Sequence, residues 1–171
     1  RVSLGSVGQT LLNSSTVPVA LSPRGMRHAP LDGLSRITVM LGESGRWRGV
    51  LSKARTFADR AGVPLRLVTV ATGDSQDTAE IEKRTEALLA EVRLDLTGLD
   101  DQRVQIVHAH SMSAAVLAME WSRNELAFLG SARLAQSGRL FLGPDANKIL
   151  RVLPVPLVAV PADPADVGGG T

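Results

Sequence analysis

The sequence predicts an α/β protein with a doubly wound, five-stranded parallel sheet and helices on both faces. Short apolar runs alternate with segments whose apolar residues recur at helical spacing, and the links between them are short. Such alternation makes the strands parallel, with helical crossovers covering both faces. A length of 171 residues with 44% hydrophobic content is enough for one core. The expected strands span residues 36–41, 65–71, 103–107, 126–129 and 155–160.

Helical patterns fill the intervals between these strands. The first helix is expected after Ser44, which can cap it, and Gly62 supplies its C-terminal stop. Its apolar face would consist of Val50, Leu51, Ala54, Phe57, Ala58 and Ala61. The later helices are expected over residues 77–96, from a cap at Ser111 or Ser113 through Trp121, and over residues 144–152.

One motif occurs twice, at residues 4–23 and 142–161. Its matching residues keep a constant offset of 138 positions, in the pairs Gly5 and Gly143, Leu12 and Leu150, Pro18 and Pro156, and Pro23 and Pro161. An offset near the length of a domain predicts two units of one architecture. The expected organisation is the closing helix and last strand of a first unit in residues 1–23, a linker in 24–35, a complete second unit in 36–161 and a disordered tail in 162–171.

Composition excludes several classes of function. The chain has no cysteine, which excludes disulfides, thiolate metal sites and cysteine nucleophiles and is typical of a reducing cytoplasm. No apolar run reaches the roughly 18 residues of a membrane span. The net charge is only +2, and the basic residues form no long block. We therefore expect a cytoplasmic protein that binds neither membranes nor nucleic acid.

Glycines mark the expected ligand site. In doubly wound sheets, ligands bind beyond the carboxyl ends of the strands, where the strand order reverses. Gly130 and Ser131 follow the strand at 126–129, and Gly143 opens the last helix. A glycine lets the backbone approach a ligand, and a helix N-terminus offers free N–H groups to a phosphate. The first copy of the motif opens with Gly5-Ser6, where a simple helix cap at Ser6 is the alternative.

These residues resemble the universal stress protein family in its tandem form. The family motif is Gly-x2-Gly-x9-Gly-(Ser/Thr), followed by a helix and a last strand containing Pro-Val. Gly5 and Ser6 match its end, and Gly130 and Gly143 match it in the second unit. The resemblance implies a Rossmann-like fold of the adenine nucleotide alpha hydrolase kind, a non-catalytic stress-response role, and pairing between the last strands of two units. That pairing would join residues 17–21 to 155–159, through Val17, Pro18, Val19, Val155, Pro156 and Leu157.

Three departures from the family pattern predict a degenerate nucleotide site in the second unit. Gly42 stands where ATP-binding members have an aspartate, and Arg133 stands where the second glycine belongs. Pro144 replaces the final Ser/Thr and has no N–H for a phosphate, although proline suits the first turn of a helix. Asp145 adds negative charge beside it. We therefore expect no cofactor in the second unit, and ATP or AMP in an intact tandem protein only through the first motif.

Two alternatives stay open at this point. One is an ATP- or AMP-binding universal stress protein that uses the motif of the first unit. The other is a nucleotide-dependent enzyme on a related sheet, which needs a Ser-Gly-Gly type of loop where residues 41–45 read Leu-Gly-Glu-Ser-Gly. The expected partners are a missing or cleaved first unit and a homo-oligomer formed through the last strands.

The remaining candidates are explained by solvation or packing. His108 and His110 share a face, but the sequence suggests no third ligand nearby, so we expect no metal site. Arg133 and Arg139 could clasp an anion, although a solvated loop is the simpler interpretation. Packing is expected of the two tryptophans, Trp47 and Trp121.

Overall fold

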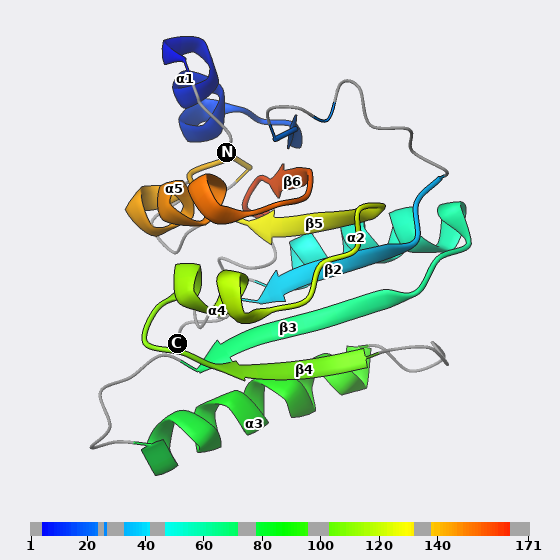
Figure 1. Cartoon of the computed structure of the whole chain (residues 1–171), viewed down its shortest axis with the longest axis vertical. Helices are drawn as coiled ribbons and strands as arrows, with labels where there is room; N and C mark the ends of the chain where they lie inside the picture. Colours follow the sequence, from blue (N-terminus) through cyan, green and yellow to red (C-terminus); the bar gives the residue numbers. More distant parts are fainter. Residues whose placement is uncertain are drawn as a thin grey trace.

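The described residues of the chain form one six-stranded sheet with helices on both faces (Figure 1). This computed structural model describes residues 5–23, 26, 33–41, 47–71, 78–95, 103–131 and 138–164. The strands are β1 (Val19–Leu21), β2 (Arg36–Leu41), β3 (Leu65–Ala71), β4 (Arg103–His108), β5 (Glu125–Gly130) and β6 (Leu157–Val160). The helices are α1 (Ser6–Ser14), α2 (Arg48–Ala61), α3 (Thr78–Asp95), α4 (Met112–Ala118) and α5 (Gly143–Val152).

Five of the strands run parallel, as the alternating pattern predicts. The sheet order is β1-β6-β5-β2-β3-β4, so the strand order reverses between β2 and β5. The sixth strand, β1, lies antiparallel along the edge of β6. Its register pairs Val19 with Ala159, Ala20 with Val158 and Leu21 with Leu157. The N-terminal segment therefore adds a sixth strand to the sheet.

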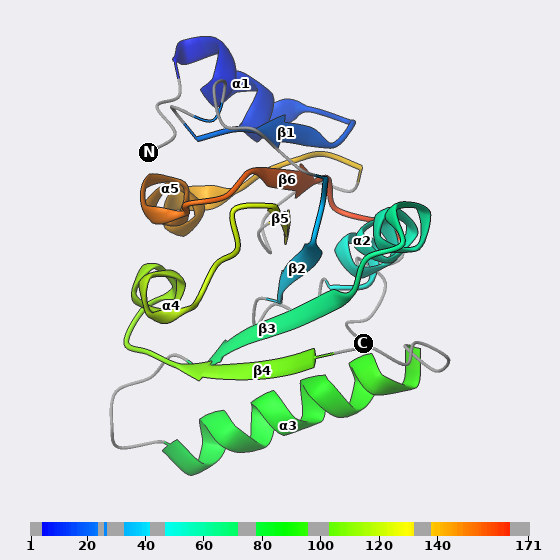
Figure 2. The same cartoon turned by 45° about the vertical axis from the view of Figure 1, so that its right-hand side comes forward.

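The helices form two layers, with α2 and α3 on one face and α4 and α5 on the other (Figure 2). The core beneath α2 includes Trp47, Leu51 and Phe128. The core beneath α5 includes Leu150 and also Leu12 of α1. The N-terminal segment thus shares a core with the last helix and strand.

Helix α2 shows how the sequence pattern translates into burial. Val50, Leu51, Ala54 and Ala58 are buried as expected. Phe57 is 49% exposed although its ring centroid lies 5.5 Å from that of Phe128, and Ala61 is exposed at the helix end. The N-cap is Trp47 rather than Ser44, which lies outside the described residues. Gly62 ends the helix as predicted, with the left-handed backbone (φ +64°) that favours glycine.

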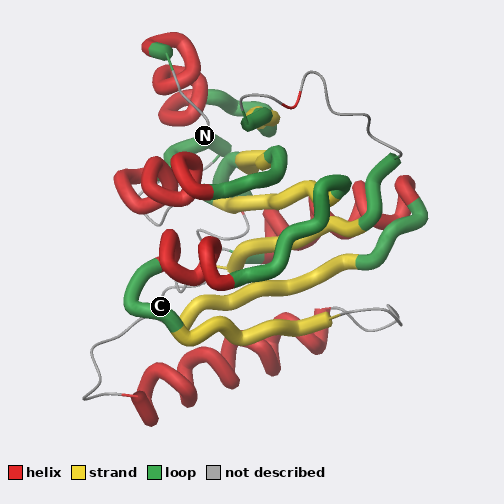
Figure 3. The backbone as a smooth tube through the Cα atoms, in the orientation of Figure 1, coloured by secondary structure: helices red, strands yellow, loops and turns green. Residues whose placement is uncertain are grey.

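Helix α4 is shorter than expected. Ser111 caps it by accepting a hydrogen bond from the N–H of Ala114 at 3.2 Å. It ends at Ala118 rather than Trp121, because the indole N–H of Trp121 bonds to the carbonyl of Val116 at 2.9 Å and satisfies one of the last free carbonyls. Residues 119–124 then cross back over the sheet without helical structure, as the tube in Figure 3 shows.

Other boundaries differ from the expectation by one or two residues. The last strand begins at Leu157 rather than at residue 155, because Pro156 has no N–H to give to a ladder. The carbonyl of Pro156 still accepts the N–H of Ala127 at 2.9 Å. β4 extends to His108 and β5 begins at Glu125, each beyond the expected strand. Most of the linker at 24–35 and the tail after residue 164 lie outside the described residues.

Candidate functional site

The carboxyl ends of β2 and β5 lie side by side at the reversal of the strand order. β2 ends at Leu41 and β5 ends at Gly130, which is partly buried and pairs in register with Val160 of β6. Ligands of doubly wound sheets bind at this edge. The fold therefore places Gly130 at the edge where the sequence predicts a ligand.

Ser131 has its hydroxyl group engaged within the fold. The residue is only 6% exposed. Its Oγ lies 3.1 Å from the carbonyl oxygen of Val160 and 3.3 Å from that of Arg139, and it accepts the N–H of Phe141 at 3.3 Å. One hydroxyl proton is thus shared between two carbonyls while a lone pair serves the N–H. Ser131 ties the end of β5 to β6 and to the loop before α5.

The opening of α5 contains Gly143 and Pro144 in the first turn, as expected from the preference of proline for this position. The N-cap is Leu142, with helical backbone angles (φ −91°, ψ −18°) and no side-chain cap. Pro144 has no N–H, so this helix start has one donor fewer for an anion than a serine or threonine would give.

The corresponding opening in the first copy is the start of α1. Gly5 is the N-cap of α1 and Ser6 is the first helical residue, so the cap lies one position before the one expected. A Cβ added at Gly5 would meet no atom within 4 Å. Both ribbon views place α1 outside β6, beyond the edge of the parallel strands (Figures 1 and 2). Gly5 and Ser6 thus lie at the start of α1, whereas Gly130 lies at the end of β5.

Two of the positions that depart from the family pattern, Gly42 and Arg133, lie outside the described residues. Arg139 is described, and its backbone carbonyl accepts the N–H of Ala162 at 3.0 Å besides facing Ser131. The suggested anion clasp between Arg133 and Arg139 therefore stays a hypothesis.

The predicted last-strand residues lie in or beside the pair formed by β1 and β6. Val19 and Leu157 lie within the two strands, and Val17, Pro18, Val155 and Pro156 come just before them. The N–H of Leu140 also donates to the carbonyl of Ser15 at 2.7 Å. The edge of β6 that could pair across a homo-oligomer is therefore occupied by β1 of the same chain.

The described residues contain no group of three or more His, Asp or Glu side chains placed to hold a metal ion. His108 and His110 are exposed. Trp47 is 1% exposed and packs in the core beneath α2. Within the described part of the chain, no helix has the length and apolar character needed to cross a membrane.

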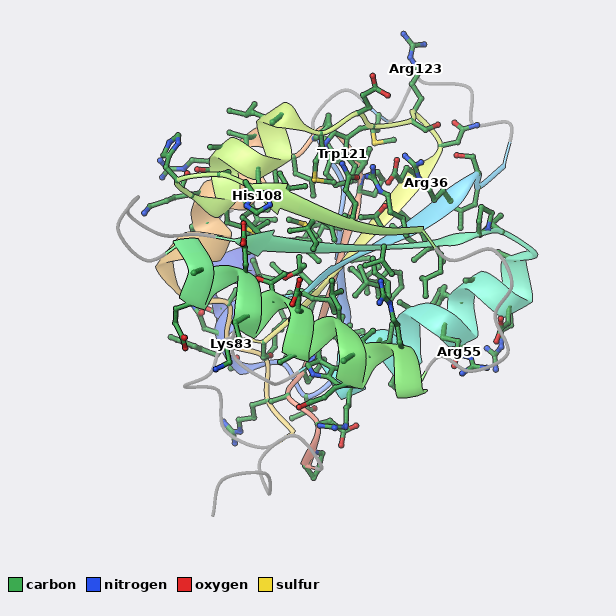
Figure 4. The ribbon with its side chains drawn as sticks, turned by 90° about the horizontal axis from the view of Figure 1, so that it is seen from below. Arg36, Arg55, Lys83, His108, Trp121 and Arg123 are labelled. Carbon is green, nitrogen blue, oxygen red and sulfur yellow. The ribbon has the colours of Figure 1, made fainter. Side chains whose placement is uncertain are left out.

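A buried polar cluster at the opposite end of the sheet was not expected from the sequence. Glu125, at the start of β5, has a fully buried side chain. Its carboxylate oxygens accept hydrogen bonds from the guanidinium groups of Arg36 at 2.6 Å and Arg66 at 2.7 Å, and also from the hydroxyl of Thr38. Figure 4 shows Arg36 at the amino end of β2, whereas His108 lies at the carboxyl end of β4. The cluster joins β2, β3 and β5 at their amino ends.

Residues 119–124, which follow α4, pack over this cluster. Arg66 donates to the carbonyl of Glu120 at 3.1 Å, and its guanidinium lies 5.0 Å from the ring centroid of Trp121. The N–H of Ser122 donates to Glu125 at 3.0 Å. Because α4 is short, these residues rather than a helix shield the charges from water.

The cluster shifts two pKa values. Burial acts to raise the pKa of Glu125, but hydrogen bonds from Arg36, Thr38 and the backbone of Ser122, with the charge of Arg66, hold that pKa below its usual value. Burial lowers the pKa of Arg66 despite its attraction to Glu125. The arrangement keeps the buried carboxylate of Glu125 charged between two arginines.

One sequence signal could have revealed this cluster. Arg36 and Glu125 open their strands with opposite charges and are direct neighbours in register. An expected strand that begins at Leu126 leaves Glu125 in the preceding loop, so the pair stays hidden.

The strand order and the two helical layers define a Rossmann-like α/β protein. No family model matches the chain. Universal stress proteins of Mycobacterium tuberculosis (strain H37Rv) and Mycobacterium bovis are each 31% identical to it over 174 residues, covering 94% of this chain and 59% of theirs.

Solved structures share the fold. A universal stress protein from Archaeoglobus fulgidus superposes with a TM-score of 0.61 at 23% identity, over 95% of this chain and 56% of its own. A functionally unknown protein from Pseudomonas aeruginosa PAO1 gives 0.65 at 16% identity, over 96% of this chain and 59% of its own. The chain belongs to the universal stress protein family. It spans 59% of the length of the curated relatives that it matches.

Proposed function

We propose that this chain is a non-catalytic universal stress protein, acting by interaction in the regulation of a stress response, with a degenerate nucleotide site in residues 36–161. The observation that carries this proposal is the engagement of Ser131. Its hydroxyl already bonds to backbone groups of β6 and of the loop before α5, so it is not free for a phosphate. The absence of cysteine favours a cytoplasmic location for this role.

The start of α5 supports the same proposal. A helix N-terminus binds anions through N–H groups that have no partner within the helix. Pro144 removes one of these donors while suiting the first turn. This substitution is what we expect where the fold is retained and the ligand is lost.

We propose in addition a two-unit organisation. Residues 1–23 close a first α/β unit, 24–35 link the units, 36–161 form the second unit, and 162–171 form a tail. The antiparallel pairing of β1 with β6 supports this division. The alternative function is ATP or AMP binding by an intact tandem protein through Gly5 and Ser6, and it is supported by the closing Gly-Ser of the family motif at the start of α1.

Calorimetric titration with Mg-ATP and with AMP tests the proposal on the nucleotide. We expect no saturable binding by the chain up to ligand concentrations of about 1 mM. Micromolar binding would overturn the proposed loss of the site, and turnover of ATP would overturn the non-catalytic role.

A restored variant sharpens this test. Gly42→Asp, Arg133→Gly and Pro144→Ser together return the family pattern and should raise nucleotide affinity by at least about tenfold, or 1.4 kcal/mol. Pro154→Ser is the matched control, because it makes the same chemical change at an exposed position after α5. Equal affinities in the restored and control variants would mean that these positions do not decide binding.

A further inference from the structure

The buried polar cluster around Glu125 carries more positive than negative charge. Among the described residues, the guanidinium groups of Arg36 and Arg66 share the carboxylate of Glu125. Burial lowers the pKa of Arg66, the charge of Glu125 opposes this shift, and the neighbouring charge of Arg36 adds to it. The cluster is therefore one negative charge short of neutrality.

The two arginines differ in how fully their N–H groups are bonded. The side chain of Arg66 is 6% exposed and donates to Thr38 at 2.9 Å, to the carbonyl of Glu120 at 3.1 Å and to Glu125 at 2.7 Å. The side chain of Arg36 is 22% exposed, and to the described residues it gives a single hydrogen bond, at 2.6 Å to Glu125. Its Nε is buried and meets no acceptor within that part of the chain, which is unfavourable for an N–H group. Arg36 is thus the member of the cluster that reaches solvent with donors unused.

Arg123 brings a further positive charge close to Arg36. The N–H of Ser122 donates to Oε2 of Glu125 at 3.0 Å, and Arg36 donates to the same oxygen at 2.6 Å. Arg123 is the next residue along the chain and is exposed. Figure 4 shows Arg36 and Arg123 at the same end of the strands, with the side chain of Arg123 pointing away from the ribbon. Two guanidinium groups therefore lie near Ser122.

Each of these arginines follows a serine, and the two hydroxyl groups meet. The Oγ atoms of Ser35 and Ser122 lie 3.2 Å apart. The hydroxyl of Ser35 donates to the carbonyl of Asn124 at 3.1 Å, so the proton between the two serines comes from Ser122. Both serines are exposed. The hydroxyl of Ser122 can therefore turn from Ser35 to a ligand oxygen.

Glu120 is the acidic residue in the covering segment, residues 119–124. It is exposed, and its backbone carbonyl bonds to Arg66. With Glu120 counted, the cluster and this segment hold three arginines and two glutamates, so an excess of positive charge remains. A guanidinium group matches a carboxylate in charge and in the geometry of its donors. A carboxylate is therefore the group that best completes this end of the sheet.

We infer that Arg36, Ser122 and Arg123 form a docking point for an acidic segment of a partner protein. One carboxylate of that segment accepts hydrogen bonds from Arg36 and balances the excess charge of the cluster, and a second carboxylate pairs with Arg123. The low net charge of the chain, +2, and the lack of a long basic block favour an acidic peptide over nucleic acid. The inference rests on the proposed interaction role, whereas nucleotide titration tests the proposed loss of the nucleotide site separately.

Fluorescence anisotropy of a labelled peptide of alternating glutamate and glycine tests the docking point on the full chain. We expect saturable binding with a Kd below about 1 mM at low ionic strength, weakening as salt screens the charges. The same peptide with glutamine in place of glutamate should not bind. In NMR spectra of the protein, the amide of Ser122 and the Nε–H of Arg36 should shift with the same saturation. Absence of saturable binding, or shifts at other residues alone, would contradict the inference.

Variants with exposed charges locate the binding. Arg123→Gln should weaken the peptide by at least about threefold, and Glu120→Gln should strengthen it because a repelling charge is removed. Lys83→Gln is the matched control, since it removes one positive charge from an exposed position on α3 and should leave the affinity nearly unchanged. Equal affinities in Arg123→Gln and Lys83→Gln would overturn the assignment. Circular dichroism verifies that each variant is folded.

Arg36→Lys tests the inner contact. Lysine keeps the positive charge beside Glu125 but lacks the planar set of donors, so the peptide should bind more weakly than to the unchanged chain. Should this variant not fold, the variants at Arg123 and Glu120 decide the question, because both positions are exposed. A single-stranded oligonucleotide is the competing ligand. Tighter binding of the oligonucleotide with the same NMR shifts would replace the acidic segment by nucleic acid and refute the inference.

Discussion

Glu125 is the residue on which the polar interactions of this fold converge. Its buried carboxylate binds arginines from two neighbouring strands and a hydroxyl from β2. A buried charge set of this kind adds little net stability compared with apolar packing, but it is costly to break, because a charge is left without its partner. The cluster therefore favours one alignment of β2, β3 and β5 over others.

Glu125→Gln should lower the free energy of unfolding by about 3 kcal/mol, because Arg36 and Arg66 lose their shared counter-charge. Urea denaturation followed by circular dichroism measures the loss. Asp59→Asn is the control, since the pair of Asp59 with Arg55 is exposed and should change stability by less than about 0.5 kcal/mol. Equal losses of unfolding free energy in the two variants would show that the buried cluster contributes no more to stability than an exposed ion pair.

The same carboxyl group makes the free energy of unfolding depend on pH. The pKa of Glu125 is lower in the folded chain than its usual value, so its contribution is present at neutral pH and is lost as the pH falls through the folded pKa. The difference in unfolding free energy between the unchanged chain and Glu125→Gln should therefore shrink between about pH 5 and pH 3. A difference that is constant over this interval would contradict the assignment.

At the scale of single elements, the ends of helices depend on particular backbone conformations. Gly62 ends α2 with φ +64°, and a Cβ there would meet no atom within 4 Å. Gly62→Ala should therefore cost about 1 kcal/mol through the backbone alone. Gly62→Asn should cost less, because asparagine tolerates this conformation, and thermal unfolding compares the two. A larger loss for asparagine would point to crowding instead.

Helix α1 offers two adjacent leucines with opposite surroundings. Leu12 is 2% exposed and Leu11 is 46% exposed. Leu12→Ala should destabilise the docking of α1 and β1 by about 2–4 kcal/mol, and Leu11→Ala by less than about 1 kcal/mol. Hydrogen exchange of the β1 amides measures the local opening. Similar exchange in both variants would mean that Leu12 does not anchor the segment.

At the scale of the whole molecule, β1 covers the edge of β6. All four residues of β6 are buried, so without β1 their strand edge and apolar side chains would face water. A chain that lacks residues 1–23 should therefore be less stable and show a higher molar mass by light scattering than the full chain. Leu11→Ser in the full chain should leave the mass unchanged. A shortened chain of unchanged stability and mass would contradict a closing role for β1.

Much of this fold follows from local patterns. The bounds of β2 and β3 agree with the sequence expectation, as do the stop at Gly62 and the cap at Ser111. These features depend on residues close together in the chain, namely an apolar run, a glycine and a serine. The candidate site was harder to predict from the sequence, because the partners of Ser131 come from residues eight to 29 positions away in the chain.

The amino-acid sequence by itself established the α/β class, the parallel direction of five strands and the repeat that links α1–β1 to α5–β6. Apolar periodicity and turn residues carry that information locally. Tertiary packing alone revealed the buried Glu125 cluster, the engaged hydroxyl of Ser131 and the uncovered side of α1. These features arise where distant strands and loops meet, so burial and hydrogen-bond partners become defined only once the sheet has assembled.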